Sequence, residues 1–431
     1  MGQRRLLVFS YSFPPTPSVG SVRVGGLARY LPEQGWEVTV VTPRRAGRGR
    51  EPGRVLETAD ADLGAGLKRM LRVPGDAALK DAIAGAASPL ARPRSARLVE
   101  LVKAIVAFPD TNRGWIPIAA RAAEQRLVEE RFDAVLSSSP PPSVHLAARR
   151  VAARARLPWV ADLRDLWSQD HNSTAPAWRR RLDRRLERRT FRGASALVTV
   201  SEPLARELRA LHPALPVRTI LNGFDPEEVG LADRLTPDFT LTHTGTFYQG
   251  RRDPSLLFET LARMLADGRI PRDRIRVRLF ARHEPWVAAL VRRHGIDDVV
   301  ELLAWTARRE ALRFQQESQV LLLLHWGGPR EEGVFTGKVF EYLAARRPVL
   351  MIGGGPGVLS QLLETTGAGV HVTDRERLER QLEAWWREFA AHGSVAWRGR
   401  GELVERYSHR RMAREFAALL DEVCGRGRPA G

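Results

Sequence analysis

Hydrophobic positions along the chain fall into short apolar runs separated by longer amphipathic stretches. Short apolar runs are typical of buried strands, and apolar residues three or four apart are typical of helices that pack on one side. Their alternation predicts parallel sheets with helices on both faces. The predicted strands are Leu6–Phe9, Val38–Val41, Ala134–Ser137, Trp159–Asp162, Leu197–Val200 and Val217–Leu221 in the first half, and Phe239–Thr242, Arg276–Phe280, Val299–Leu302, Val320–Leu324, Val349–Ile352 and Gly369–Val372 in the second.

The two series of strands predict an α/β chain with two Rossmann-like, doubly wound domains that face a cleft. A chain of 431 residues is also too long for one ordinary core. We expect an N-terminal domain over residues 1–225, a C-terminal domain over 236–405 and a last helix over 406–431. Residues 44–110 are rich in Arg, Gly, Pro and Ala, and we expect an insertion of helices and loops there.

The charge is strongly positive, at +18, and almost all of the 68 basic residues are arginines. Such charge attracts phosphate-bearing molecules, anionic lipids or nucleic acid, although a solvated, arginine-rich surface is the simpler interpretation. The one cysteine, Cys424, has no partner for an intramolecular disulfide. No stretch resembles a signal peptide or a membrane span, so we expect a cytoplasmic protein.

Polar and charged residues follow two strands of the first domain. Gly20, Ser21 and Arg23 lie where the loop after the first strand enters a helix. A glycine there permits close approach of a ligand, and a helix start offers N–H groups to an anion, so we predict a phosphate-binding loop; a plain turn is the alternative.

Asp162, Arg164 and Asp165 follow the strand that begins at Trp159. Charges at the end of a buried strand need partners. We interpret these three as catalytic residues that orient sugar hydroxyls or perform acid–base chemistry. The alternative is an ion cluster that fixes the loop.

The second domain begins with a glycine-containing loop and two arginines, which predict a diphosphate site. The residues are Gly245, Thr246, Arg251 and Arg252. His325 closes a later strand and is expected to face the same cleft, although a lone histidine is more often structural.

Gly337, Lys338 and Glu341 form the most informative group. Lys338 stands in the first turn of a predicted helix, in a chain that otherwise uses arginine, and Glu341 follows on the same face. We expect Lys338 to bind phosphate and Glu341 to accept hydrogen bonds from ribose hydroxyls. An intrahelical Lys–Glu pair is the alternative. The stretch is not a P-loop, because Glu332 and Val339 break that pattern.

Residues Trp178–Arg192 predict a basic amphipathic helix with Trp178, Leu182 and Leu186 on one stripe. Such a helix suits weak, salt-sensitive binding to an anionic membrane surface, on the inner face of the cell membrane. The alternative is a surface helix that packs this stripe on the sheet.

Several motifs, in the same order, resemble the retaining GT-B glycosyltransferases of family 4. The likeness covers nearly the whole chain apart from residues 44–110. It rests on Phe13-Pro14-Pro15 with Gly20 and Arg23, on Asp162–Trp167, on Ser201-Glu202, on Asn222–Asp225 and on Lys338–Ala344.

This resemblance implies a transferase that moves a sugar from a nucleotide-sugar donor, with retention of configuration and without a metal or other cofactor. It also implies that the C-terminal domain holds the donor, that Arg251 or Arg252 lies at its diphosphate, and that the last helix crosses back to the N-terminal domain. The loop at Gly20, Ser21 and Arg23 is then expected to approach the donor phosphate and the acceptor. Two departures stand out. Gly333 replaces the first glutamate of the family's Glu-x7-Glu motif, and no histidine follows the strand that ends at Asp162.

The acceptor expected from this resemblance is a sugar, a lipid-linked molecule or a small molecule, as in polysaccharide or glycoconjugate biosynthesis. A nucleotide-sugar epimerase of the same fold is one alternative. An inactive protein that binds membranes or nucleic acid is another, but the basic residues are spread along the chain without a nucleic-acid motif, so we expect no nucleic-acid partner.

Overall fold

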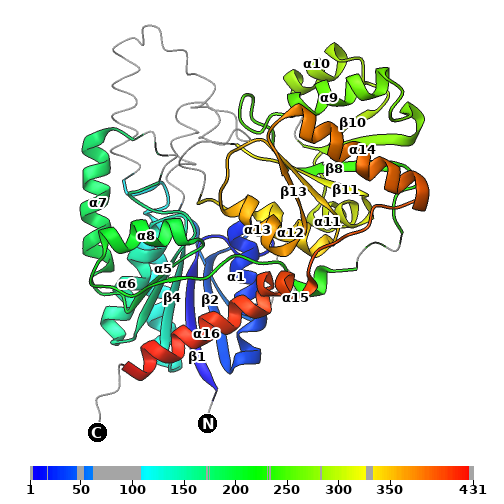
Figure 1. Cartoon of the computed structure of the whole chain (residues 1–431). Coiled ribbons are helices and arrows are strands. Elements are labelled where there is room, and N and C mark those ends of the chain that lie inside the picture. The colour runs from blue at the N-terminus through cyan, green and yellow to red at the C-terminus, as the bar shows by residue number, and fades with distance from the viewer. Residues whose placement is uncertain are drawn as a thin grey trace. The chain divides into compact units, whose positions relative to one another are not determined.

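The structure is a computed structural model that describes residues 3–16, 18–45, 53–61, 108–170, 173, 175–230, 232, 234–281, 284–326 and 333–426. The chain forms two compact units, each with its own sheet (Figure 1). The first unit combines Met1–Ile220 with Ala413–Gly431, and the second is Leu221–Met412. No helix in the described ranges has the length and apolarity that crossing a bilayer requires.

The first unit contains a seven-stranded parallel sheet in the order β3-β2-β1-β4-β5-β6-β7. Alternate residues of β1 bury on opposite faces: Leu7 and Phe9 join the core beneath α5 and α6, while Leu6 and Val8 are also fully buried outside that core. The sheet is therefore covered on both sides. The strands are β1 Arg4–Ser10, β2 Trp36–Pro43, β3 Arg54–Thr58, β4 Ala134–Ser139, β5 Trp159–Leu163, β6 Ala196–Thr199 and β7 Val217–Thr219. The helices are α1 Val19–Tyr30, α5 Trp115–Glu129, α6 Ser143–Ala155, α7 Ala177–Phe191, α8 Glu202–Leu211 and, from Ala413 onward, α16 His409–Arg426.

The second unit contains a six-stranded parallel sheet in the order β10-β9-β8-β11-β12-β13. Its core gathers side chains of the strands with those of α9, α10 and α14, and a separate apolar cluster lies around α12 and α13. The strands are β8 Phe239–Thr244, β9 Ile275–Phe280, β10 Val300–Leu303, β11 Val320–Leu324, β12 Val349–Ile352 and β13 Gly369–Val372. The helices are α9 Ser255–Ala266, α10 Pro285–Arg293, α11 Arg308–Glu317, α12 Gly337–Ala345, α13 Val358–Thr366, α14 Arg375–His392 and α15 Gly401–Val404. Single 3-10 turns are η1 Pro32–Gln34, η2 Pro226–Glu228, η3 Arg272–Arg274 and η4 Glu405–Tyr407.

The two Rossmann-like sheets confirm the predicted α/β fold, and every predicted strand is present with ends that differ by at most two residues. In each sheet the strand order reverses beside the first strand, between β1 and β4 and between β8 and β11. Loops at the carboxyl ends of strands beside such a reversal are where doubly wound sheets bind ligands.

The 44–110 insertion was expected to hold only helices and loops, but Arg54–Thr58 forms the edge strand β3. This strand is only partly buried, so its sequence lacks a recognisable apolar run. Pairing with β2 and a hydrogen bond from Trp115 Nε1 to Thr58 Oγ1 (2.8 Å) hold it in place. Residues 46–52 and 62–107 of the insertion lie outside the described residues.

The boundary between the units lies at Ile220, a few residues before the expected end of the N-terminal domain at residue 225. The reason is a bridge between Phe224 and Ser408, in which the N–H of Phe224 donates to the carbonyl of Tyr407 (2.9 Å). A β-carbon on Gly223 would lie 2.5 Å from that carbonyl oxygen, so glycine is required beside this bridge. The bridge joins the expected linker to the second unit.

Candidate functional site

In the first unit, Asp162 is the centre of a buried polar cluster at the carboxyl ends of β4 and β5. Its carboxylate is fully buried and accepts hydrogen bonds from Arg23 Nε (3.0 Å), Arg23 Nη2 (2.8 Å) and Ser138 Oγ (2.7 Å). Arg23 also donates to the carbonyl of Ile220 (3.0 Å) and lies over the ring of Phe416. Because both carboxylate oxygens are engaged inside the protein, this geometry supports the ion-cluster alternative for Asp162 over a catalytic role.

Arg164 lies above this cluster and against α1. Its Nε donates to Ser138 Oγ (3.3 Å), and a β-carbon on Gly20 would lie 2.1 Å from Nη1 of Arg164. Glycine at position 20 therefore lets a guanidinium rest on the first turn of α1. Burial lowers the pKa of Arg164, and the nearby Arg23 acts in the same direction. A half-buried cation at a helix N-terminus is suited to an anionic group.

The other two residues predicted for the first unit have simpler surroundings. Ser21 is buried, and its N–H donates to Ser18 Oγ (3.1 Å), which caps α1. Asp165 is exposed and close enough to Arg164 to favour its charged form. The structure thus brings Gly20, Arg23, Asp162 and Arg164 together.

In the second unit, Lys338 lies in the first turn of α12 with its ammonium against Gly245. A β-carbon at position 245 would lie 1.9 Å from Cε and 2.0 Å from Nζ of Lys338, and Gly245 has a φ of 134°. Burial and the charge of Arg252 lower the pKa of Lys338 to about 8, whereas Glu341 acts in the opposite direction. Among the described residues, no carboxylate forms an ion pair with Lys338 or Arg252.

His325 is the third nitrogen-bearing side chain of this group, after Lys338 and Arg252. Burial, Arg252 and His371 lower its pKa to about 4, so the ring is neutral at pH 7. Its ring packs on Gly354, where a β-carbon would lie 2.4 Å from Cδ2, and Gly354 has a φ of 71°. The structure therefore gathers Gly245, Arg252, His325 and Lys338 around the start of α12.

The structure separates the two adjacent arginines. Arg252 interacts electrostatically with Lys338 and His325, whereas Arg251 is exposed and its guanidinium lies 3.7 Å from the centre of the Trp326 ring. Arg252 is therefore the stronger candidate of the two for an anion. Thr246 is half-buried beside them.

Glu341 is held by residues that the sequence did not single out. Its two oxygens accept hydrogen bonds from Arg308 Nη1 (3.1 Å) and Gln315 Nε2 (3.2 Å). Gln315 is fully buried and also donates to Thr244 Oγ1 (2.9 Å), while Arg308 pairs with Glu228 (2.7 Å). These contacts replace the intrahelical Lys–Glu pair as the main anchor of Glu341. No spacing in the sequence points to them, because they join α11 to α12 and to the end of β8.

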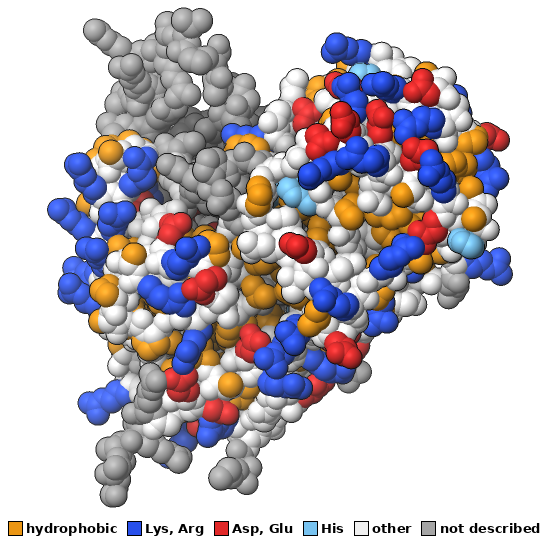
Figure 2. Space-filling model, in the orientation of Figure 1, with side chains coloured by type: hydrophobic (Ala, Val, Ile, Leu, Met, Phe, Trp, Pro, Cys, Tyr) orange, Lys and Arg blue, Asp and Glu red, His pale blue; other side chains and the backbone are white. Residues whose placement is uncertain are grey.

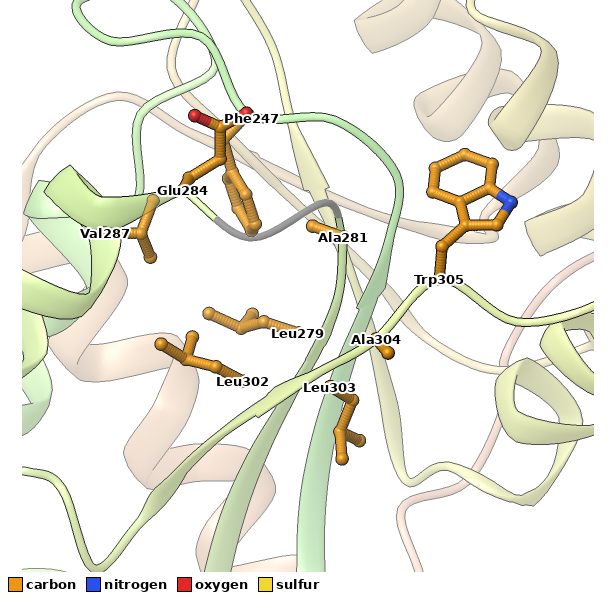
Figure 3. Close-up of a pocket in the computed structure, with 9 residues that line it drawn as sticks. All are labelled: Phe247, Leu279, Ala281, Glu284, Val287, Leu302, Leu303, Ala304 and Trp305. Carbon is orange, nitrogen blue, oxygen red and sulfur yellow. The ribbon is translucent and has the colours of Figure 1, made fainter. Parts of the chain in front are cut away.

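An apolar pocket of about 280 Å³ lies at the carboxyl ends of β9 and β10. Figure 3 shows Phe247, Leu279, Val287 and Leu302 around one space, with Trp305 standing apart beyond the strand end. Trp305 is 61% exposed, although large aromatic side chains usually bury most of their surface. The pocket was not predicted, because its apolar residues read as ordinary strand and helix positions.

Comparison with known proteins adds a family and a fold. Residues 20–228 match the family model described as Glycosyltransferase Family 4. No curated protein sequence matches the chain.

Solved structures with the same fold cover nearly the whole chain. One is sucrose-phosphate synthase from Thermosynechococcus elongatus, with 15% identity over 98% of this chain and 100% of that one, and a TM-score of 0.60. Another is HepE of Anabaena, solved with UDP and glucose, with 15% identity over 97% of this chain and 100% of that one, and a TM-score of 0.59. A third is a glycosyltransferase from Rickettsia africae ESF-5, with 12% identity over 98% of this chain and 99% of that one, and a TM-score of 0.61.

The family match covers most of the first unit, including its polar cluster, and the structural likeness extends over both sheets. The expected resemblance is thus confirmed for the fold and for residues 20–228: the chain has the fold of the GT-B glycosyltransferases, and nearly half of it matches glycosyltransferase family 4.

Proposed function

We propose that this protein transfers a sugar from a nucleoside-diphosphate sugar to a hydroxyl group of an acceptor. In this reaction the bond between the anomeric carbon and the diphosphate oxygen breaks, and a new bond forms between that carbon and the acceptor oxygen. The diphosphate leaves with one more negative charge than it carries in the donor, and the acceptor hydroxyl gives up its proton, so the protein must stabilise an anion.

The observation that carries this proposal is the pair of cations at the start of α12. Lys338 and Arg252 lie near each other, and burial together with the charge of Arg252 lowers the pKa of Lys338. Holding two cations together is unfavourable unless a ligand neutralises them. The first-turn N–H groups of α12 add to the attraction for a diphosphate.

Glu341 is the candidate partner of the ribose hydroxyls. Arg308 and Gln315 fix its carboxylate, which keeps part of its surface exposed, and a carboxylate accepts two hydrogen bonds from neighbouring hydroxyls. The base then lies toward the apolar pocket, where Phe247 and the exposed Trp305 suit a flat heterocycle. HepE was solved with UDP and with UDP-glucose, so uracil is the first base to test.

We propose that neither a metal nor another cofactor takes part, because Arg252, Lys338 and the start of α12 supply the positive charge that the leaving group needs. Retention of configuration is part of the proposal through the resemblance to family 4. The acceptor class stays broad: a sugar, a lipid-linked molecule or a small molecule, in polysaccharide or glycoconjugate synthesis inside the cell.

The test is a titration of the full chain with UDP, GDP, dTDP and ADP, in the presence of EDTA, by calorimetry. We expect one nucleotide to bind, and we expect Lys338→Ala to abolish that binding. Lys338 is the one lysine among the described residues, so no second lysine can serve as a control. Arg251→Ala is used instead, because it also removes one positive charge nearby. If no nucleotide binds, or if Arg251→Ala and Lys338→Ala are equally damaging, the proposed donor site is wrong.

A further inference from the structure

The helix α7 presents its exposed side chains in an unusual arrangement. Trp178 is 37% exposed and Leu182 is 40% exposed, and these two residues are one helical turn apart. The same outer stripe continues with arginines only. The exposed arginines on it are Arg181, Arg185, Arg188 and Arg189.

The inner face of α7 is where its acidic residues lie. Asp183 pairs with Arg179 (2.9 Å), and Glu187 accepts a hydrogen bond from the N–H of Ser168 (3.0 Å) and contacts His212 (3.4 Å). Both carboxylates are buried. The helix thus turns its carboxylates inward, which leaves the outer stripe with positive charge alone.

Trp178 and Leu182 depart from the usual placement on a surface helix, in which apolar residues face the core. Phe191 at the end of α7 is fully buried in the core, and Leu186 packs against it in part. The alternative that the whole stripe packs on the sheet therefore holds for Leu186 but not for Trp178 and Leu182. Figure 2 shows basic side chains along the flank where α7 lies.

We infer that the outer face of α7 docks on the surface of an anionic lipid bilayer. Arginines bind lipid phosphates and carboxylates by charge, and the indole of Trp178 and the side chain of Leu182 enter the interfacial region. Among the described residues, none of Arg181, Arg185, Arg188 and Arg189 forms an ion pair, so their charge is available to an external anion. A nucleic acid would use the arginines but would leave Leu182 without a role.

The binding experiment uses the full chain and sedimented vesicles. Vesicles of phosphatidylcholine with about one-third phosphatidylglycerol are compared with vesicles of phosphatidylcholine alone. We expect binding to the anionic vesicles only, and we expect its loss between about 0.01 M and 1 M salt, over which the Debye length falls from about 30 Å to about 3 Å.

A pair of variants with equal charge change tests the position of the site. Arg181, Arg185, Arg188 and Arg189 are changed to Gln in one variant, and we expect vesicle binding at least about tenfold weaker. In the control, four exposed arginines of α14 that pair with neighbouring carboxylates are changed to Gln. They are Arg375, Arg377, Arg380 and Arg387.

Equal losses in the two variants would overturn the inference, because they would mean that net charge alone governs binding. So would tight binding of single-stranded or duplex nucleic acid without vesicle binding. Circular dichroism and UDP binding of each variant report folding and the donor site separately, so failure of the membrane inference leaves the proposed function standing.

A second measurement does not depend on the arginines. Lipids brominated along their chains quench the fluorescence of a tryptophan that enters the bilayer. We expect Trp178→Phe to remove the quenched component while the protein still binds vesicles. If the quenching is unchanged in Trp178→Phe, the outer face of α7 is not the part of the protein that enters the membrane.

Discussion

The ammonium of Lys338 lies so close to Gly245 that a β-carbon on residue 245 would be only 2.0 Å from Nζ of Lys338. Position 245 must therefore be glycine for the lysine to lie where it does. This relationship links a residue at the end of β8 to one in the first turn of α12, almost a hundred residues later.

Gly245→Ala is expected to displace Lys338 and to abolish nucleotide binding, because both the steric clash and the φ of 134° oppose a side chain there. The measurement is nucleotide affinity by calorimetry. Gly268→Ala is the matched control, since Gly268 also has a positive φ, of 67°, but has nothing within 4 Å of a β-carbon. Comparable affinity in the two variants would contradict the role given to Lys338.

The pH dependence of nucleotide binding follows from the lowered pKa of Lys338, about 8. The lysine is charged below that pH and loses its proton above it, so affinity is expected to be constant up to about pH 8 and to fall as the pH rises further. Lys338→Arg is expected to bind more weakly at pH 7 but to keep its affinity up to pH 10, because arginine stays protonated. An unchanged affinity of the wild type at pH 10 would rule out a phosphate contact by Lys338.

Lys338 also affects stability in the absence of a ligand. Its pKa is lower in the folded protein than the usual value of 10.5, so the folded state is destabilised at pH 7 and regains stability between about pH 8 and the unfolded pKa. Lys338→Met is therefore expected to raise Tm without nucleotide and to remove the gain in Tm on adding UDP. A lower Tm would show that the cation stabilises the fold.

Glu341→Ala separates ribose from diphosphate recognition. The variant is expected to bind UDP about tenfold to a hundredfold more weakly, in line with the loss of hydrogen bonds to a charged group, while inorganic diphosphate binds as in the wild type. Gln315→Leu is expected to act in the same direction, since it removes a donor that holds Glu341. Equal losses for UDP and diphosphate would instead place Glu341 at the phosphates.

Trp305→Ala tests the position of the base. We expect weaker UDP binding and unchanged binding of inorganic diphosphate, because the indole belongs to the lining of the pocket and Lys338 does not. Trp178→Ala removes a tryptophan of lower but comparable exposure from the other unit and is expected to leave both affinities unchanged. Full UDP affinity in Trp305→Ala would exclude this pocket edge as the base site.

Asp162→Asn distinguishes a structural ion pair from a catalytic carboxylate. Asp162 and Arg23 are both almost fully buried, and removing one charge of such a pair costs about 3–5 kcal/mol. We expect a large loss in the free energy of unfolding for Asp162→Asn and none for Asp165→Asn, whose carboxylate is exposed. A stable but inactive Asp162→Asn enzyme would restore the catalytic interpretation.

The sequence predicted the two sheets well because buried parallel strands are apolar along their whole length, as in Val320–Leu324. It missed β3, which is an edge strand with only partial burial. The glycine at position 245 and the lysine at position 338 were both predicted as site residues, because each has an unusual residue type at a strand or helix end.

Contacts between side chains on different helices and strands were harder to predict from the sequence. Whether Arg251 or Arg252 faces the anion depends on the turn at Gly250, which has a φ of 68°, and the sequence alone left both open. Gln315 and Arg308 became visible only when α11 was placed against α12. Hydrogen-bond partners such as Ser138 and Asp162 lie on neighbouring strands, so predicting them requires the strand order.

The residues that complete the first unit are synthesised after the second unit. Asp421 in α16 accepts hydrogen bonds from Arg4 (2.6 Å) and from Trp36 Nε1 (3.1 Å), and Phe416 lies beneath Arg23. During synthesis the ribosome must therefore finish the whole second unit before these contacts can form. Domains usually fold in the order of their synthesis. Here the nascent second unit has all its residues while the first unit still lacks a helix. A stalled or shortened chain would therefore leave Arg23 without its contact to Phe416 and Trp36 without its contact to Asp421.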